Sequence, residues 1–158
     1  MFSSQQWLEI RRLVKQANHV SVATVTPDGS PHVSPIGSFS LHPTEPRGYW
    51  LEKFPSNLPR HLEADQRVQI MAVQGGVGFW LKSLWRGDFV GPPAVRLVGT
   101  AGPLRPITDQ ERERFQKRVK LVRSLKGAKY LWTGMAVARD ITIEEIVPVR
   151  LGSMWPRM

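Results

Sequence analysis

Cysteine is absent from this 158-residue sequence, and so are long apolar runs. Without cysteine the chain forms no disulfide, offers no thiolate to a metal and has no cysteine nucleophile. No apolar run approaches the roughly 20 residues of a membrane-spanning helix, so we expect no membrane partner. The opening residues, MFSSQQWLEIRRL, lack the basic-then-apolar order of a signal peptide. These absences together predict a cytoplasmic protein.

Acidic residues are scarce beside basic ones. The chain has 13 Asp and Glu against 22 Lys and Arg, which gives a formal net charge of +9. Such an excess favours an anionic partner: nucleic acid, an anionic membrane surface, or a phosphorylated or carboxylated small molecule. The net charge alone does not choose among these.

Motifs for metal binding and nucleophilic catalysis are also missing. The histidines are His19, His32, His42 and His61, and no two of them are spaced i, i+2 or i, i+4. No Gly-x-Ser-x-Gly elbow is present, and no serine has a recognisable base and orienting acid. We therefore expect no metal site and assign no catalytic residue from the sequence.

The pattern of apolar residues predicts one domain, residues 1–158, rich in strands. Pro27, Asp28 and Gly29 form a turn signal. Pro35 lacks an N–H and predicts an edge or a bulge in the second strand, while Gly99 and Gly102 predict bulges or sharp coiling. A Thr108–Glu111 capping box opens a helix expected to reach about residue 124. The resulting fold class is mainly β, a small barrel with flanking helices. The expected strands are 19–25, 32–41, 49–54, 67–73, 94–104 and 141–151, and the expected helices are 4–17, 56–65 and 108–124.

The segment 52–60 joins a strand end to a helix N-terminus. Free backbone N–H groups and the positive end of the helix dipole suit a phosphate there. Ser56 and Asn57 add donors, and Lys53 and Arg60 add charge. The alternative is an ordinary capped helix with two surface cations.

Two further segments each allow two interpretations. The helix 108–124 carries many cations around an apolar stripe, which indicates either a solvated surface helix or a surface for nucleic acid or another anion. The segment 75–93, expected to be a long loop with a helical turn, is either a dimer contact or part of a site. In a site, Trp80 and Trp85 would flank a planar ligand, and Lys82 or Arg86 would face an anionic one.

Two stretches, HVSVATVTPDGSPHVSPIG and YWLEKFPSNLPRHLEADQRVQIMA, resemble the pyridoxamine 5′-phosphate oxidase-related FMN-binding split-barrel family. The resemblance covers residues 5–104 and, more loosely, the last strand. It implies a six-stranded split β-barrel, a homodimer with flavin at the subunit interface, and a flavin-dependent oxidoreductase acting on a small molecule. It places His32, Val33 and Ser34 along the flavin, and Lys53, Ser56, Asn57 and Arg60 at its phosphate.

The sequence also departs from that family's pattern. Leu58 stands where a lysine is frequent, His32 where the oxidases proper often have an arginine, and Ala94 where they use a glutamine. The C-terminal Trp and Arg of the oxidases are not clearly reproduced, although Trp155 is available. We therefore expect a divergent member rather than the oxidase proper.

Two other cofactors stay open beside FMN. Related split barrels use the deazaflavin F420, whose acidic tail suits a basic protein, and others handle haem, which one of the four histidines would ligate. Nucleic acid is the least expected partner, because the cations of helix 108–124 are not interleaved with aromatics but spread around an apolar stripe.

Overall fold

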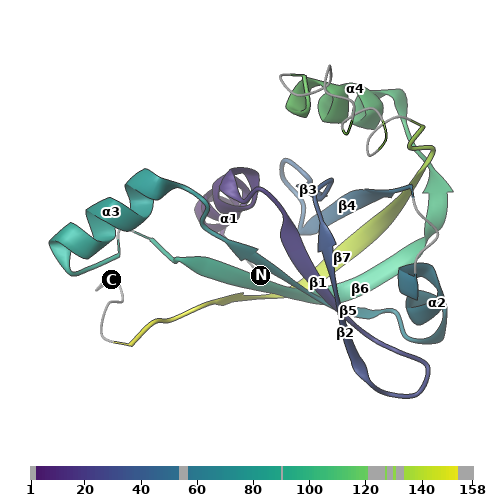
Figure 1. The fold of residues 1–158 in the computed structure, drawn as a ribbon, viewed down its shortest axis with the longest axis horizontal. Helices are drawn as coiled ribbons and strands as arrows, with labels where there is room; N and C mark the ends of the chain where they lie inside the picture. Colours follow the sequence, from purple (N-terminus) through teal and green to yellow (C-terminus); the bar gives the residue numbers. More distant parts are fainter. Residues whose placement is uncertain are drawn as a thin grey trace.

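A computed structural model describes residues 3–53, 57–89, 91–120, 127, 130 and 134–152. The described residues form four helices and seven strands, which are labelled in Figure 1. Their bounds, in chain order, are α1 Ser4–Gln16, β1 Val20–Val25, β2 Pro31–Ile36, β3 Ser40–Leu41, β4 Arg47–Glu52, α2 Asn57–Ala64, β5 Arg67–Val73, α3 Val77–Arg86, β6 Ala94–Pro106, α4 Asp109–Arg118 and β7 Val137–Pro148.

The strands form one antiparallel sheet in the order β2-β1-β5-β6-β7-β4-β3. The sheet curls into a half-barrel (Figure 1), which confirms the predicted mainly-β fold with flanking helices. It has one strand more than the six expected, because the predicted strand 32–41 divides into β2 and β3. Ser38 fixes the bend between them: its Oγ accepts from Leu51 N and donates to Leu51 O, both at 3.0 Å. The two parts of that predicted strand therefore lie at opposite edges of the sheet.

The β1–β2 hairpin follows its sequence signals closely. Gly29 has φ +87°, the left-handed conformation that glycine adopts most easily. Thr26 Oγ1 donates to Asp28 and accepts from Ser30 N, which closes the turn. β2 is an edge strand, as Pro35 predicts: with no strand paired on one side, β2 tolerates a residue that has no N–H to donate.

Both glycines of β6 lie at irregularities in its pairing with β7. The register shifts between Val98 and Gly99, and again between Ala101 and Leu104, the interval that contains Gly102. A Cβ at Gly99 would lie 1.9 Å from the carbonyl oxygen of Thr142. Only glycine allows the two strands to approach so closely, and the predicted bulges are confirmed.

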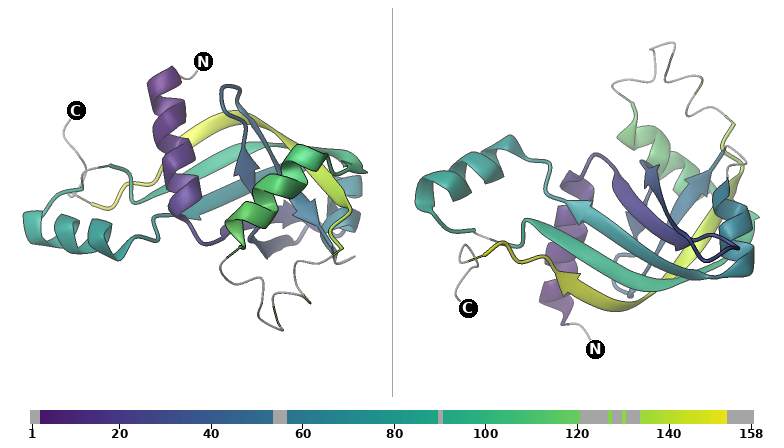
Figure 2. Two further views of the ribbon diagram at one scale, coloured as in Figure 1. Left: turned by 90° about the horizontal axis from the view of Figure 1, so that it is seen from above. Right: turned by 60° about the horizontal axis from the view of Figure 1, so that its bottom comes forward.

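The core lies between the sheet and α1, which crosses the strands (Figure 2). A capping box joins Ser3 and Gln6 at the start of this helix, and four of its side chains are buried against the sheet. Trp50, Ile70 and Leu97 of the sheet are also at most 1% exposed. The buried helix residues are Trp7, Ile10, Leu13 and Val14.

Two sequence predictions about helices are wrong in extent. α4 begins with the predicted capping box at Thr108, but it ends at Arg118, and residues 121–124 of the predicted helix lie outside the described residues. The segment 75–93 contains a full ten-residue helix, α3, rather than a single helical turn. Gly87, at φ +68°, ends that helix. No helix in the described ranges is long and apolar enough to cross a membrane.

Candidate functional site

The strand β2 carries the first group of predicted site residues. Its exposure alternates along the strand, so His32 and Ser34 share the half-buried face while Val33 points the other way. The Val33 side chain is 60% exposed. Of the three residues predicted on β2, His32 and Ser34 can therefore present side chains to a ligand on the inner face, and Val33 cannot.

His32 contacts a second histidine that belongs to α2. The ring centroids of His32 and His61 are 4.7 Å apart, and the rings meet edge to face at 76°. His61 is 4% exposed, and its Nδ1 lies 3.2 Å from the hydroxyl of Thr24, the residue paired with His32 across the hairpin. This contact joins the inner face of β2 to α2.

The environment of His61 disfavours its charged form. Burial lowers the pKa of His61, and the neighbouring His32 and Arg60 lower it further, while Asp28 opposes them. His61 is therefore an uncharged imidazole near neutral pH, able to hold a hydrogen bond without adding positive charge.

The start of α2 carries the second group of predicted residues. Asn57 is the first residue of the helix, and Arg60 lies three positions on, so both exposed side chains share one face. Leu58, at the position where the resemblance expects a lysine, is 3% exposed and belongs to the core. Ser56 lies outside the described residues. A cation and an amide donor beside a helix N-terminus are a donor set that fits a phosphate.

Lys53 is engaged elsewhere. Its Nζ donates to the carbonyl oxygen of Tyr130 and lies 5.5 Å from the centre of the Tyr130 ring. A phosphate at α2 would have to compete with this contact, so Arg60 is the better-placed cation.

A buried ion pair fixes the strand that leads into this segment. Arg139 Nε donates to Glu52 Oε1 at 2.7 Å, and the two side chains are 5% and 9% exposed. Trp50 Nε1 donates to the same carboxylate oxygen at 2.8 Å, and Arg139 Nη1 donates to Gly102 O at 2.8 Å. β4 therefore ends in a well-determined position one residue before Lys53.

The remaining predicted residues lie on α3. Lys82 and Arg86 are exposed, and α3 and α2 occupy opposite ends of the molecule in every view (Figures 1 and 2). One chain therefore does not bring Lys82 and Arg86 together with Asn57 and Arg60.

The tryptophans predicted to flank a ligand have different surroundings. Trp80, on α3, packs within the connection between β5 and β6: its Nε1 donates to Gln74 O at 2.8 Å and its ring meets the Phe89 ring edge to face at 5.8 Å. Trp85 is 89% exposed. Ala94 is buried at the start of β6, and Trp155 lies outside the described residues.

No sequence motif predicts the contact between His32 and His61. The two residues are far apart along the chain, and they meet only because α2 packs against β1. No group of three or more His, Cys, Asp or Glu side chains suited to a metal occurs among the described residues.

Solved proteins with the same architecture are named for different cofactors. An FMN-binding protein from Syntrophomonas wolfei has 14% identity and a TM-score of 0.58, covering 93% of this chain and 94% of that one. An F420 reductase has 14% identity and a TM-score of 0.56, covering 87% and 94%. HutZ, the heme storage protein from Vibrio cholerae, has 15% identity and a TM-score of 0.58, covering 89% and 92%. At such identities the likeness shows the shared split-barrel fold alone.

Sequence comparison is more specific about the family. None of the curated protein sequences matches this chain. The sequence profile of the pyridoxamine 5′-phosphate oxidase family, however, matches residues 7–149, nearly its whole length. The chain belongs to the pyridoxamine 5′-phosphate oxidase family.

Proposed function

We propose that this protein binds FMN and acts as a cytoplasmic oxidoreductase on a small molecule. The observation that carries the proposal is the contact between His32 on β2 and His61 on α2. It brings the strand expected to run along a flavin beside the helix whose N-terminus is expected to hold the phosphate. Membership of the family and the FMN-binding neighbour support the same assignment, and the lack of cysteine supports the location.

The side chains divide into phosphate-binding and ring-facing groups. Arg60 supplies charge and Asn57 an amide donor at the start of α2. His32 and Ser34 face the flavin ring or its ribityl chain. The imidazole of His32 is the group on this face that can carry a proton. His61, kept uncharged, supports the position of His32 by the edge-to-face contact. Bound FMN would itself supply the hydride chemistry.

The first experiment is the spectrum of the purified protein, followed by titration with FMN and with riboflavin. Arg60→Ala should weaken FMN binding about tenfold or more, the loss of one charge-assisted contact. It should change riboflavin binding little, because riboflavin lacks the phosphate. Arg12→Ala, an exposed cation on α1, is the matched control. Failure of the wild-type protein to bind FMN at micromolar concentration would overturn the proposal.

F420 is the second candidate cofactor, favoured by the charge of +9. Its acidic tail predicts a steeper loss of affinity with added salt than FMN shows. Haem is a third candidate, and His32 is its best-placed ligand because His61 is buried against Thr24. A Soret band that His32→Ala abolishes would favour haem over both flavins.

We also propose a homodimer, on the evidence of an exposed apolar stripe on α3. The stripe is spaced i, i+4, i+7 and i+8, and each of its side chains is at least 64% exposed. Such a surface is typical of an interface, and a second copy would cover it and bring Lys82 and Arg86 to the partner's flavin site. The stripe consists of Val77, Leu81, Leu84 and Trp85.

Light scattering after gel filtration tests the dimer. Leu84→Glu should shift the wild-type dimer toward the monomer, while Arg12→Glu, an exposed position on α1 outside the stripe, should leave the dimer intact. A wild-type monomer, or a Leu84→Glu variant that remains fully dimeric, would contradict this interface.

A further inference from the structure

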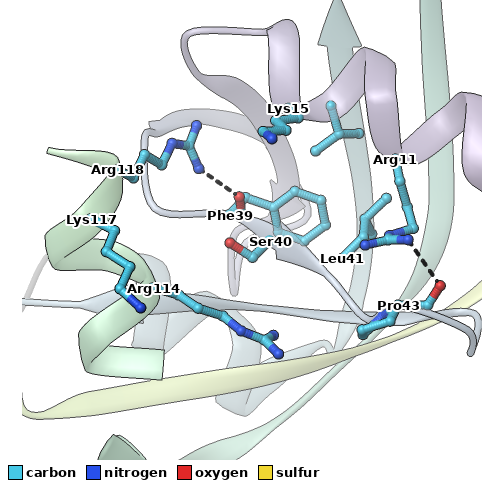
Figure 3. Close-up of a pocket in the computed structure, with 10 residues that line it drawn as sticks. Arg11, Lys15, Phe39, Ser40, Leu41, Pro43, Arg114, Lys117 and Arg118 are labelled. Carbon is cyan, nitrogen blue, oxygen red and sulfur yellow. Dashed lines mark hydrogen bonds between the residues drawn. The ribbon is translucent and has the colours of Figure 1, made fainter. Parts of the chain in front are cut away.

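A second cleft lies away from β2 and α2, between α1, the β3 segment and α4 (Figure 3). Its volume is about 770 Å³, within the range of small-molecule sites. β3 forms the edge of the sheet opposite β2. The cleft is therefore separate from the proposed flavin site, and its function does not depend on that proposal.

Among the described residues, every charged side chain that lines this cleft is positive. The five cations are Arg11 and Lys15 from α1 and Arg114, Lys117 and Arg118 from α4. Figure 3 shows the two groups on the two sides of the β3 segment. Each helix supplies its cations from one face, because their spacing is i, i+4 on α1 and i, i+3, i+4 on α4.

Little negative charge within the chain balances these cations. Among the described residues, the only carboxylate within 4.0 Å of any of the five is Glu113, which lies 4.0 Å from Lys117 on an exposed surface. Arg11 and Arg118 instead donate to backbone carbonyl oxygens, those of Pro43 at 3.1 Å and Phe39 at 3.0 Å. These bonds hold the two guanidinium groups at the two ends of the β3 segment. The cost of gathering like charges around one cleft falls when an anion binds there.

The walls of the cleft are fixed by the fold. Trp7 Nε1 donates to His42 O at 3.0 Å, which ties α1 to the chain just after β3. Arg105 joins α4 to β7, since it donates to both carboxylate oxygens of Glu111 and of Asp140 at 2.6–2.9 Å. The cations are therefore carried on helices whose positions are already set before a ligand arrives.

The floor of the cleft is apolar. Val14, Phe39 and Leu41 line it and are each at most 8% exposed. A floor of this kind suits an aromatic or aliphatic body, while the cationic rim suits its charged groups. The sequence of the helix that carries the α4 cations allows either a solvated surface or an anion-binding surface. Because its cations line the same cleft as Arg11 and Lys15 of α1, the structure favours the anion-binding surface.

We propose that this cleft binds a small organic polyanion, a molecule with an apolar body and two or more phosphate or carboxylate groups. ATP and inorganic triphosphate, both without divalent metal, are the probes. They carry similar charge, and only ATP has an aromatic body for the floor. Calorimetric titration should show that wild-type protein binds both, and ATP more tightly.

A matched pair of double variants tests the location. Lys15→Glu/Lys117→Glu reverses two cations of the cleft, and Arg12→Glu/Lys120→Glu reverses two exposed cations of the same helical regions that do not line it. Both variants lower the net charge equally. The first should weaken ATP binding about tenfold or more, the second by about twofold or less. All four positions are exposed, and circular dichroism and thermal melting check that both variants fold.

Four results would overturn the proposal. If neither probe binds wild-type protein, there is no polyanion site. If the two double variants lose affinity equally, the attraction is that of the net charge. If saturating FMN abolishes ATP binding, the probe occupies the flavin site. Displacement of ATP by a single-stranded DNA oligonucleotide, lost in Lys15→Glu/Lys117→Glu, would reassign the cleft to nucleic acid and overturn the small-molecule assignment.

Discussion

The buried ion pair of Arg139 and Glu52 provides the sharpest test of the fold, and Arg139→Met is the perturbation. This substitution removes the cation that lies 2.7 Å from the Glu52 carboxylate. The Glu52 side chain is 9% exposed and then keeps only the Trp50 indole as a hydrogen-bond donor. Breaking a buried pair in this way costs about 3–5 kcal/mol. For a domain of this size, each kcal/mol lowers the melting temperature by about 2–4 °C. The expected fall is therefore about 6–20 °C.

Urea unfolding followed by circular dichroism measures this loss, and a second variant identifies its cause. Arg139→Met/Glu52→Gln removes the unpaired charge but keeps an oxygen to accept from Trp50. It should recover about 2 kcal/mol or more of the loss, because a buried amide costs less than a buried carboxylate. A loss below about 1 kcal/mol for Arg139→Met, the value of an exposed pair, would refute the reasoning, as would no recovery in the double variant.

Three further predictions concern packing, pH and the position of α4. Gly99→Ala should lower the free energy of unfolding in urea by about 1–3 kcal/mol or more, because the new Cβ would lie 1.9 Å from a carbonyl oxygen of β7. Gly102→Ala should lower it much less, because a Cβ there would lie 3.5 Å from its nearest neighbouring atom. The free energy of unfolding should fall as the pH drops from 6.5, the ordinary pKa of His, toward the lowered pKa of His61, because in this range the unfolded chain binds a proton that the folded chain does not. The dependence of stability on pH should be shallower in His61→Gln, and an unchanged dependence would contradict this prediction. Arg105→Ala should lower stability by about 1–3 kcal/mol and weaken ATP binding at the cleft, because α4 loses its link to β7; undiminished ATP affinity would contradict this role.

Local chemistry allowed much of the fold to be predicted from the sequence. The capping box at Thr108, the turn at Gly29, the edge position of Pro35 and the bulges at Gly99 and Gly102 each depend on a few neighbouring residues. The same holds for the order of the helices and strands apart from β3 and α3, and for α2, which is expected over 56–65 and lies at Asn57–Ala64. Each of these signals lies within a few consecutive residues, so the sequence alone is enough to predict it.

Only the tertiary structure decided which distant residues meet. The predicted strand 32–41 divides because Ser38 bonds to β4, a partner that no local pattern specifies. His32 lies against His61 because α2 packs on β1. The cations of α1 and α4 form one cleft because both helices flank β3 at the sheet edge. The sequence by itself determined most of the helices and strands, with their caps, turns and bulges, because these depend on neighbouring residues. Register and packing across the sheet decided the sites, because a contact between distant residues depends on both partners and on every strand between them.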